Sequence, residues 1–389
     1  MNCQRHLFDL PSDLVYLNCA RRGPQTKKLA AIGMEAIQRQ CNPTAYSNAD
    51  FFQFPQAVKE AFAQLISADD PNRIAIIPSA SYGLANVANN LNLKKEEKII
   101  IVGEQFPSNV YPWMAAVEKV GANLEIITPP SIENRAINWN EAILSAIDDQ
   151  TKLVAMGHIH WTDGTLFDLK RIREKTKQHN ALLVLDGTQS IGALPFSVKE
   201  IQPDALIAPS YKWMLGPYSL GVAYYGPAFD GGEPIEQNWI NRVNSDDFTN
   251  LVNYQPLYRP KANRYSMGEQ SNFILCPLLS TAIRQINEWG VANIQDYCIK
   301  ITQQTVAEWR DMGLYIEADD WRSHHLFGIR LNDNFDSQQL KEAIQAANIS
   351  VSFRGTAMRV SPNIYNEESE VQQLLNCFKK AKKRANFSI

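Results

Sequence analysis

The sequence predicts an α/β protein with a mostly parallel sheet in its first part and a smaller α+β domain in its last part. Two observations support this prediction. Apolar runs of four or five residues, bounded by turn residues, recur through the first 225 residues, and such runs are typical of strands buried on both faces. Segments with apolar residues at helical spacing separate the runs, as expected for a parallel sheet covered by helices.

The elements of the first part follow in order from this patterning. Residues 15–24 predict a short strand that ends in a Gly-Pro turn. Strands are then expected at 73–77, 98–102, 124–128, 152–156, 181–185, 205–208 and 219–225, with helices at 26–40, 54–66, from Ser81 to Leu91, 140–147 and 168–179. Residues 228–262 are rich in Asp, Asn, Gly and Pro and lack periodicity, which predicts a long excursion near the active site that leads into the small domain.

The second part combines longer helices with short strands. Helices are expected at 273–289, 293–312 and 336–347, and strands at 314–317, 326–331 and 349–353. This mixture predicts the smaller α+β domain.

Composition excludes several classes of function. The 38 basic and 41 acidic residues give a net charge of −3 without a basic block, so nucleic acid is not an expected partner. No apolar stretch approaches 18 residues and the start lacks an apolar signal core, so we expect a cytoplasmic protein without a membrane span. The six cysteines form no C-x-x-C pair, and His158 and His160 lack further ligands at metal-binding spacing, so no metal site is predicted.

Two charged residues stand at the ends of neighbouring apolar runs. Asp186 directly follows the run 181–185, and Lys212 comes shortly after the run 205–208. Because ligands of open α/β sheets bind beyond the carboxyl ends of the strands, we expect both side chains in one crevice. An amine and a fixed carboxylate are what pyridoxal phosphate requires: the lysine forms the Schiff base and later serves as general base at Cα, and the carboxylate keeps the pyridine nitrogen protonated.

A phosphate site is expected at the start of the helix near residue 81. The small-residue turn Pro78–Gly83 leads into this helix and leaves backbone N–H groups free at a positive dipole end. The backbone at Ala80 and the hydroxyl of Ser81 are the candidate ligands. Ser79 and Ser81 are also good helix caps, a common role without any ligand.

Several motifs together resemble one known family. Asp186-Gly187-Thr188-Gln189, Ser210-Tyr211-Lys212, Gly216-Pro217 and the string 354–366 are similar to motifs of the class V aminotransferases, which include cysteine desulfurases, isopenicillin N epimerase, cystine lyases and kynureninase. The resemblance covers about 15–366. It implies the fold-type I architecture of pyridoxal-phosphate enzymes, with a large cofactor-binding domain at 15–262, a small domain at 1–14 plus 263–389, and a homodimer that shares its active sites.

The same resemblance assigns further cofactor contacts. Gln189 hydrogen-bonds the ring oxygen, Phe106 stacks on the ring where desulfurases carry a histidine, and Ser210 or Tyr211 holds the phosphate. In the dimer, the segment 264–272 reaches the partner's phosphate. Glu269 replaces the family's threonine there, so Gln270 or Ser271 is expected to make that contact.

The substrate contacts are also implied by the resemblance. Arg359 grips the substrate α-carboxylate with its guanidinium fork, and Asn18 and Arg21 lie at the substrate mouth. Trp161 stands where desulfurases carry an asparagine, in a region where epimerase and cystine-lyase relatives carry a tryptophan. Arg354 and Arg21 are both candidates for a second carboxylate clamp, which a transaminase with a dicarboxylic amino donor requires, and the sequence does not decide between them.

The exact reaction is left open between alternatives. Desulfurases carry a cysteine nucleophile on the loop before the terminal arginine, and residues 352–358 contain no cysteine. An enzyme of the epimerase or lyase branch that acts at Cα of an amino acid is therefore the main prediction. A cysteine desulfurase or C–S lyase and a transaminase are the alternatives, and a catalytically silent binding protein with the same fold is the alternative of another class.

Overall fold

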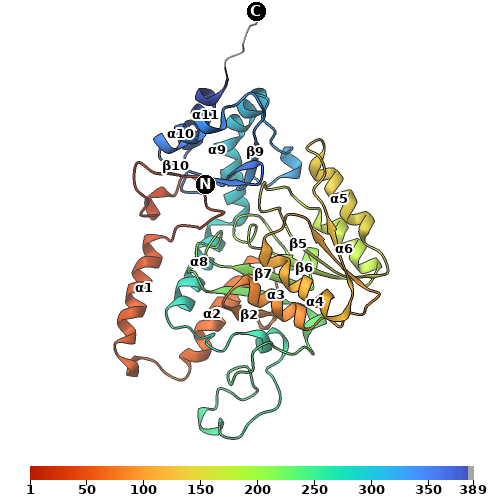
Figure 1. Cartoon of the computed structure of the whole chain (residues 1–389). Helices are drawn as coiled ribbons and strands as arrows, with labels where there is room; N and C mark the ends of the chain where they lie inside the picture. Colours follow the sequence, from red (N-terminus) through yellow and green to blue (C-terminus); the bar gives the residue numbers. More distant parts are fainter. Residues whose placement is uncertain (384–389) are drawn as a thin grey trace, which may run out of the picture.

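A seven-stranded sheet forms the centre of the molecule in a computed structural model that describes residues 1–383 (Figure 1). The strand order is β2-β8-β7-β6-β5-β3-β4, and only β8 runs antiparallel to its neighbours. The strands are β2 (Ile74–Ile77), β3 (Lys98–Val102), β4 (Asn123–Ile127), β5 (Thr151–Gly157), β6 (Leu182–Asp186), β7 (Ala205–Pro209) and β8 (Gly221–Tyr225). The prediction of a mostly parallel sheet of seven strands is confirmed.

Helices cover both faces of this sheet, which explains the uninterrupted apolar runs. Leu183 and Leu185 face the core shared with α2, α5, α6 and α8, whereas Val184 between them faces the core shared with α3 and α4. The helices are α1 (Lys27–Gln40), α2 (Asp50–Leu65), α3 (Ala80–Asn89), α4 (Tyr111–Val120), α5 (Arg135–Ala146), α6 (Leu169–Gln178), α7 (Val198–Ile201) and α8 (Leu275–Trp289).

The C-terminal part forms a separate hydrophobic core at the top of Figure 1. It contains a three-stranded antiparallel sheet of order β11-β12-β9 and a parallel pair of β10 with the N-terminal β1. Its elements are β1 (Val15–Tyr16), α9 (Val291–Asp311), β9 (Phe327–Arg330), α10 (Ser337–Ala346), β10 (Ile349–Ser350), β11 (Ser352–Arg354), β12 (Ala357–Val360) and α11 (Glu368–Ala381). Val15 and Leu17 pack into this core. The domain boundaries named above stay a prediction.

Several segments differ from the prediction, among them the short helix α7 and the strand β12, which are not predicted. Helix α4 is not predicted because Pro112 interrupts its pattern, but this proline lies in the first turn, where its missing N–H is tolerated. No helix is predicted for α11 either. The expected strand at 314–317 is reduced to one bridge between Tyr315 and Arg330, because the segment meets β9 only at that strand's last residue.

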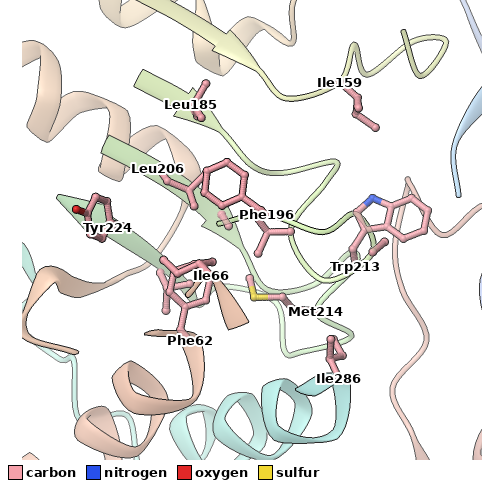
Figure 2. Packing of buried hydrophobic residues seen from close by; sticks show 14 of the residues in the cluster. Phe62, Ile66, Ile159, Leu185, Phe196, Leu206, Trp213, Met214, Tyr224 and Ile286 are labelled. Atoms are coloured by element: carbon pink, nitrogen blue, oxygen red, sulfur yellow. The ribbon is translucent and has the colours of Figure 1, made fainter. Parts of the chain in front are cut away.

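The loop that carries Lys212 rests on the main core. Trp213 and Met214, which follow the lysine, belong to this core, and Figure 2 shows Met214 near Phe62 and Ile66 at the end of α2, with Trp213 farther along the cluster. Both Trp213 and Met214 are almost fully buried. Because these side chains fill a close-packed interior, the backbone at 212 has little freedom to shift.

The backbone of Gly23 packs closely against this loop, and a substitution at Gly23 tests how rigidly the loop is held. A Cβ at Gly23 would lie 2.0 Å from the carbonyl oxygen of Lys212, so we expect Gly23→Ala to destabilise the protein by about 2 kcal/mol or more. Gly33→Ala in α1 is the matched control, because its Cβ meets only the side chain of Leu278, at 3.5 Å or more. The control is expected to stabilise by roughly 0.5–1 kcal/mol. Urea unfolding of both variants measures these changes, and equal stabilities would contradict the close packing.

Candidate active site

One cavity lies beyond the carboxyl ends of β3, β5, β6 and β7, and Asp186 and Lys212 both line it. The cavity encloses about 420 Å³, its open mouth included. Its other lining residues are Val102, Gln105, Phe106, Gly157, Ile159, His160, Trp161, Phe167, Thr188 and Gln189. The strand ends therefore bring the acid and the amine together as the sequence predicts.

Lys212 is held almost fully buried, with 7% of its surface exposed. The amide of Gly23 donates to the carbonyl oxygen of Tyr211 at 2.9 Å, and Leu215 adopts a left-handed φ of 52°, so the loop turns sharply behind the amine. Burial, followed by the charge of Arg359, lowers the pKa of Lys212 to about 8, although Asp186 acts in the opposite direction. About a tenth of the amine is thus unprotonated at pH 7, far more than for an exposed lysine, and the unprotonated form is the one that a nucleophile or base requires.

Asp186 ends β6 and points its carboxylate into the same cavity. Its Oδ1 accepts a hydrogen bond from the amide of Thr188 at 2.9 Å. Burial raises the pKa of Asp186, while the hydrogen bonds from Thr188 and the charge of Lys212 lower it. Sequence reasoning missed Thr188 as a site residue, although an Asp followed two residues later by a Thr amide is a common local turn.

Behind the cavity, Gln189 connects three parts of the chain. Its side chain donates to the carbonyl oxygen of Ala20 at 3.1 Å and accepts from the indole N–H of Trp213 at 2.8 Å. Its own carbonyl oxygen lies 2.7 Å from Nε2 of His325, whose ring packs edge-on against Trp213. One N–H of the Gln189 amide group stays available to a ligand.

The buried His325 predicts a pH dependence of stability. Burial lowers the pKa of His325 to about 3, so between pH 6.5 and about 3 the unfolded chain binds a proton that the folded chain does not. Stability therefore falls as the pH decreases through this window, by up to about 1.4 kcal/mol per pH unit for this residue. We expect His325→Gln to flatten the decline. Urea unfolding between pH 7 and 4 measures it, and parallel curves for both proteins would refute this assignment.

Two aromatic rings form the outer wall of the cavity. Phe106 and Trp161 meet edge to face with centroids 5.4 Å apart, and the amine of Lys212 lies 5.6 Å from the Phe106 centroid. The indole N–H of Trp161 donates to the carbonyl oxygen of Glu104 at 2.7 Å. This bond fixes the ring plane, so the wall is pre-formed.

Arg359 projects from β12 toward this wall and is 1% exposed. Its Nη1 donates to the carbonyl oxygen of Trp161 at 2.9 Å, and its buried Nε has no partner. Burial, with the nearby charge of Arg354, lowers the pKa of Arg359 to about 9. Within residues 1–383 Arg359 pairs with no acid, so its guanidinium is available to an anionic ligand.

The start of α3 leaves backbone donors free. Ser79 is the N-cap, and its hydroxyl accepts from the amide of Tyr82 at 3.2 Å. Ser81 is therefore not the cap; it lies in the first turn, and its exposed hydroxyl is 3.3 Å from that of Ser108. The amides of Ala80 and Ser81 lack partners inside the helix and can bind an anion.

Like Ala80, Ser81 and Arg359, the remaining predicted residues lie outside the cavity lining. Asn18 is buried, and its amide group bonds the hydroxyls of Ser350 and Ser352, whereas Arg21 is exposed. Ser210 is buried with its hydroxyl donating to the carbonyl oxygen of Pro217. Their roles toward ligands stay predictions.

Three other predicted residues also lie outside the lining. Tyr211 is half-buried against Tyr218, and its ring centroid lies 5.6 Å from the amine of Lys212. Gln270 donates to Asn241 at 3.1 Å, and Ser271 donates to the carbonyl oxygen of Phe51 at 2.7 Å. Neither Gln270 nor Ser271 lines the cavity of its own chain, and their predicted contact with the cofactor of a partner subunit stays a prediction.

The two histidines near β5 face different cavities. His160 lines the cavity of Lys212, and its two ring nitrogens contact the Thr162 hydroxyl and the Gly103 carbonyl oxygen. His158 lines a separate surface cavity. Within the described part of the chain, no group of three or more His, Cys, Asp or Glu is arranged to hold a metal ion.

Comparison with known proteins identifies the family. The model of the family Aminotransferase class-V matches residues 42–374. The chain belongs to this family. Membership makes it a pyridoxal-phosphate-dependent enzyme, so the predicted family and cofactor are confirmed. The same result argues against the silent binding protein.

Relatives and solved structures agree with this assignment. An uncharacterized aminotransferase of Bacillus subtilis, YcbU, is 25% identical over 319 residues, which cover 82% of this chain and 81% of the relative. Isopenicillin N epimerase of Streptomyces clavuligerus is 22% identical over 81% of both chains. The apo structure of a cysteine desulfurase from Thermococcus onnurineus NA1 superimposes with a TM-score of 0.81 over 97% of both chains at 18% identity. The expected fold-type I architecture is confirmed.

Proposed function

We propose that the protein acts at Cα of an amino acid through Lys212, as an enzyme of the epimerase or C–S lyase branch of its family. The observation that carries the proposal is the meeting of the Lys212 amine and the Asp186 carboxylate in one cavity beside the unpaired Arg359. When bound, pyridoxal phosphate supplies an electron sink for the pair released by the broken Cα bond.

The residues present fit this group in chemical type, and the hydroxyl of Ser81 lies 3.3 Å from that of Ser108, two residues after the cavity-lining Phe106. The free amides of Ala80 and Ser81 suit its phosphate, the carboxylate of Asp186 suits the ring nitrogen, and the amine of Lys212 suits the aldehyde. Phe106 provides an apolar face for the ring, and the orphaned Nε of Arg359 supports binding of the substrate carboxylate.

Each of the side chains at the site has its own role in the proposed reaction. The amine of Lys212, once released, moves the proton at Cα, and its pKa of about 8 suits that task near neutral pH. Gln189 and Asp186 would hold the cofactor ring, and Arg359 would hold the substrate by its carboxylate, so that the substrate has one orientation relative to the amine of Lys212.

The positions of the cysteines argue against a cysteine desulfurase, which needs a reactive thiol in the active site. The hairpin β11–β12 closes with the turn residues Gly355 and Thr356 and offers no thiol. Cys19, whose sulfur lies 3.9 Å from the Lys212 carbonyl oxygen, is buried, and burial raises its pKa to about 11. A thiol with that pKa is not a nucleophile at neutral pH.

Incubation of the enzyme with a panel of amino acids in deuterated water tests the reaction. Deuterium at Cα without net product supports an epimerase, and pyruvate with released sulfide or persulfide supports a C–S lyase. Exchange that depends on an added keto acid would assign a transaminase and overturn the proposal, as would the absence of any Cα exchange.

We also propose a cytoplasmic homodimer. All six cysteines are free, which suits a reducing compartment. Apolar side chains are exposed on α1, at the side of the molecule in Figure 1, and on the 228–262 excursion, such as Met34 at 66% and Tyr254 at 92%. Light scattering should give twice the chain mass, and an active monomer would contradict the dimer.

A further inference from the structure

Two arginines lie beside the same wall of the cavity, yet the α-carboxylate of an amino-acid substrate requires only one of them. The guanidinium carbons of Arg354 and Arg359 lie 5.6 Å and 5.9 Å from the centroid of the Trp161 ring. Among residues 1–383, neither arginine forms an ion pair. The single side-chain hydrogen bond found for Arg354 runs from its Nη1 to the carbonyl oxygen of Phe353 at 2.7 Å.

The hairpin geometry directs both guanidinium groups to one side. Arg359 on β12 stands opposite Ser352 on β11, and Arg354 lies two residues beyond Ser352. Residues that face each other across an antiparallel pair share a face, as do residues two apart in a strand. Arg354 and Arg359 therefore lie on the same face of one hairpin, at a spacing fixed by its register.

The charges around the cavity are unbalanced. The charges of Arg354 and Arg359 both lower the pKa of Lys212, and that of Arg354 lowers the pKa of Arg359. The two arginines are thus permanent cations on one side of Lys212, with Asp186 the acid that acts in the opposite direction at the amine. Arg359 is buried without an acid partner and Arg354 is half-buried beside it, an arrangement that favours a ligand with more than one negative group.

We propose that Arg354 binds a second carboxylate of the substrate, so that the substrate class is amino acids that carry two carboxylates. This inference rests on the proposed function, in which Arg359 takes the α-carboxylate. Arg354 is half-buried, so a ligand in the cavity mouth reaches it. A guanidinium group donates two parallel hydrogen bonds to a carboxylate and also carries a positive charge. A glutamine side chain has no charge and cannot donate the same pair of hydrogen bonds.

Binding to the pyridoxal-phosphate-loaded enzyme tests the assignment. Titration calorimetry compares glutamate with glutamine and aspartate with asparagine. Arg354→Gln is expected to weaken binding of the favoured acidic amino acid by about 10- to 100-fold, and binding of its amide by less than about threefold, because hydrogen bonds to charged groups contribute about 1.5–3 kcal/mol. Lys341→Gln is the matched control: this exposed cation lies 5.7 Å from the ring of Phe353, next to Arg354, and should leave both affinities unchanged.

One further variant and one further ligand test whether Arg354 recognises a carboxylate. Arg354→Lys keeps the charge without the fork and should lose part of the affinity; full retention of charge selectivity by Arg354→Gln would overturn the inference. Cysteate carries a sulfonate in place of the carboxylate, and a preference for it over aspartate would overturn the carboxylate assignment. If the enzyme binds no pyridoxal phosphate, the proposed function fails instead, which the visible absorbance of the cofactor reports before any titration.

Discussion

Lys212→Ala is expected to lower kcat by at least about 10⁴-fold on whichever amino acid the wild-type enzyme turns over, because the substitution removes both the point of covalent attachment and the proton carrier. The amine is buried in a cavity that Asp186 shares, and its pKa of about 8 leaves it partly unprotonated near neutral pH. The variant is expected to fold, since Trp213 and Met214 supply the loop's packing.

Steady-state kinetics and borohydride labelling measure the effect of this substitution. Reduction of the loaded wild-type enzyme should tag the peptide that contains Lys212, and the tag should be absent from the variant. Lys170→Ala provides the control, because that lysine is exposed on α6 and pairs only with Glu200. Activity within tenfold of wild type in Lys212→Ala, or a tag on another lysine, would refute the role of Lys212.

The sequence predicts that the acid and the amine of this centre meet because both stand at the ends of strands. Asp186 and Lys212 follow apolar runs that are buried on both faces, and parallel strands bring such ends to one edge. Phe106 follows β3 and is found on the cavity wall for the same reason.

Contacts between distant segments escaped prediction because no local pattern encodes them. The hydrogen bond from Arg359 to the carbonyl oxygen of Trp161 joins residues 198 positions apart. The link from Gln189 to His325 spans 136 positions. Periodicity reports which face of an element is buried, but which element covers that face depends on the packing of the whole chain.

Asp186→Asn is expected to lower kcat by about 10²- to 10³-fold, the usual cost of removing one preorganised electrostatic group from an active site. Asparagine has the same shape and can accept the hydrogen bond from the Thr188 amide, which Asp186 accepts at 2.9 Å in the native chain. The fold should therefore survive while the negative charge is lost. Thr188→Val is the matched control, since it keeps the carboxylate and removes only one supporting hydroxyl, and its kcat should fall by about tenfold or less.

The same substitution should change Lys212 in the absence of cofactor, which separates an electrostatic role from a structural one. The charge of Asp186 raises the pKa of Lys212 against the larger effect of burial. Without that charge, the pKa of Lys212 should fall below about 8, and the pH dependence of its labelling by an amine-reactive reagent should shift to lower pH. Thr188→Val keeps the charge and should leave this profile close to wild type. An unshifted profile in Asp186→Asn, or kcat within threefold of wild type, would show that the carboxylate does not act on the amine.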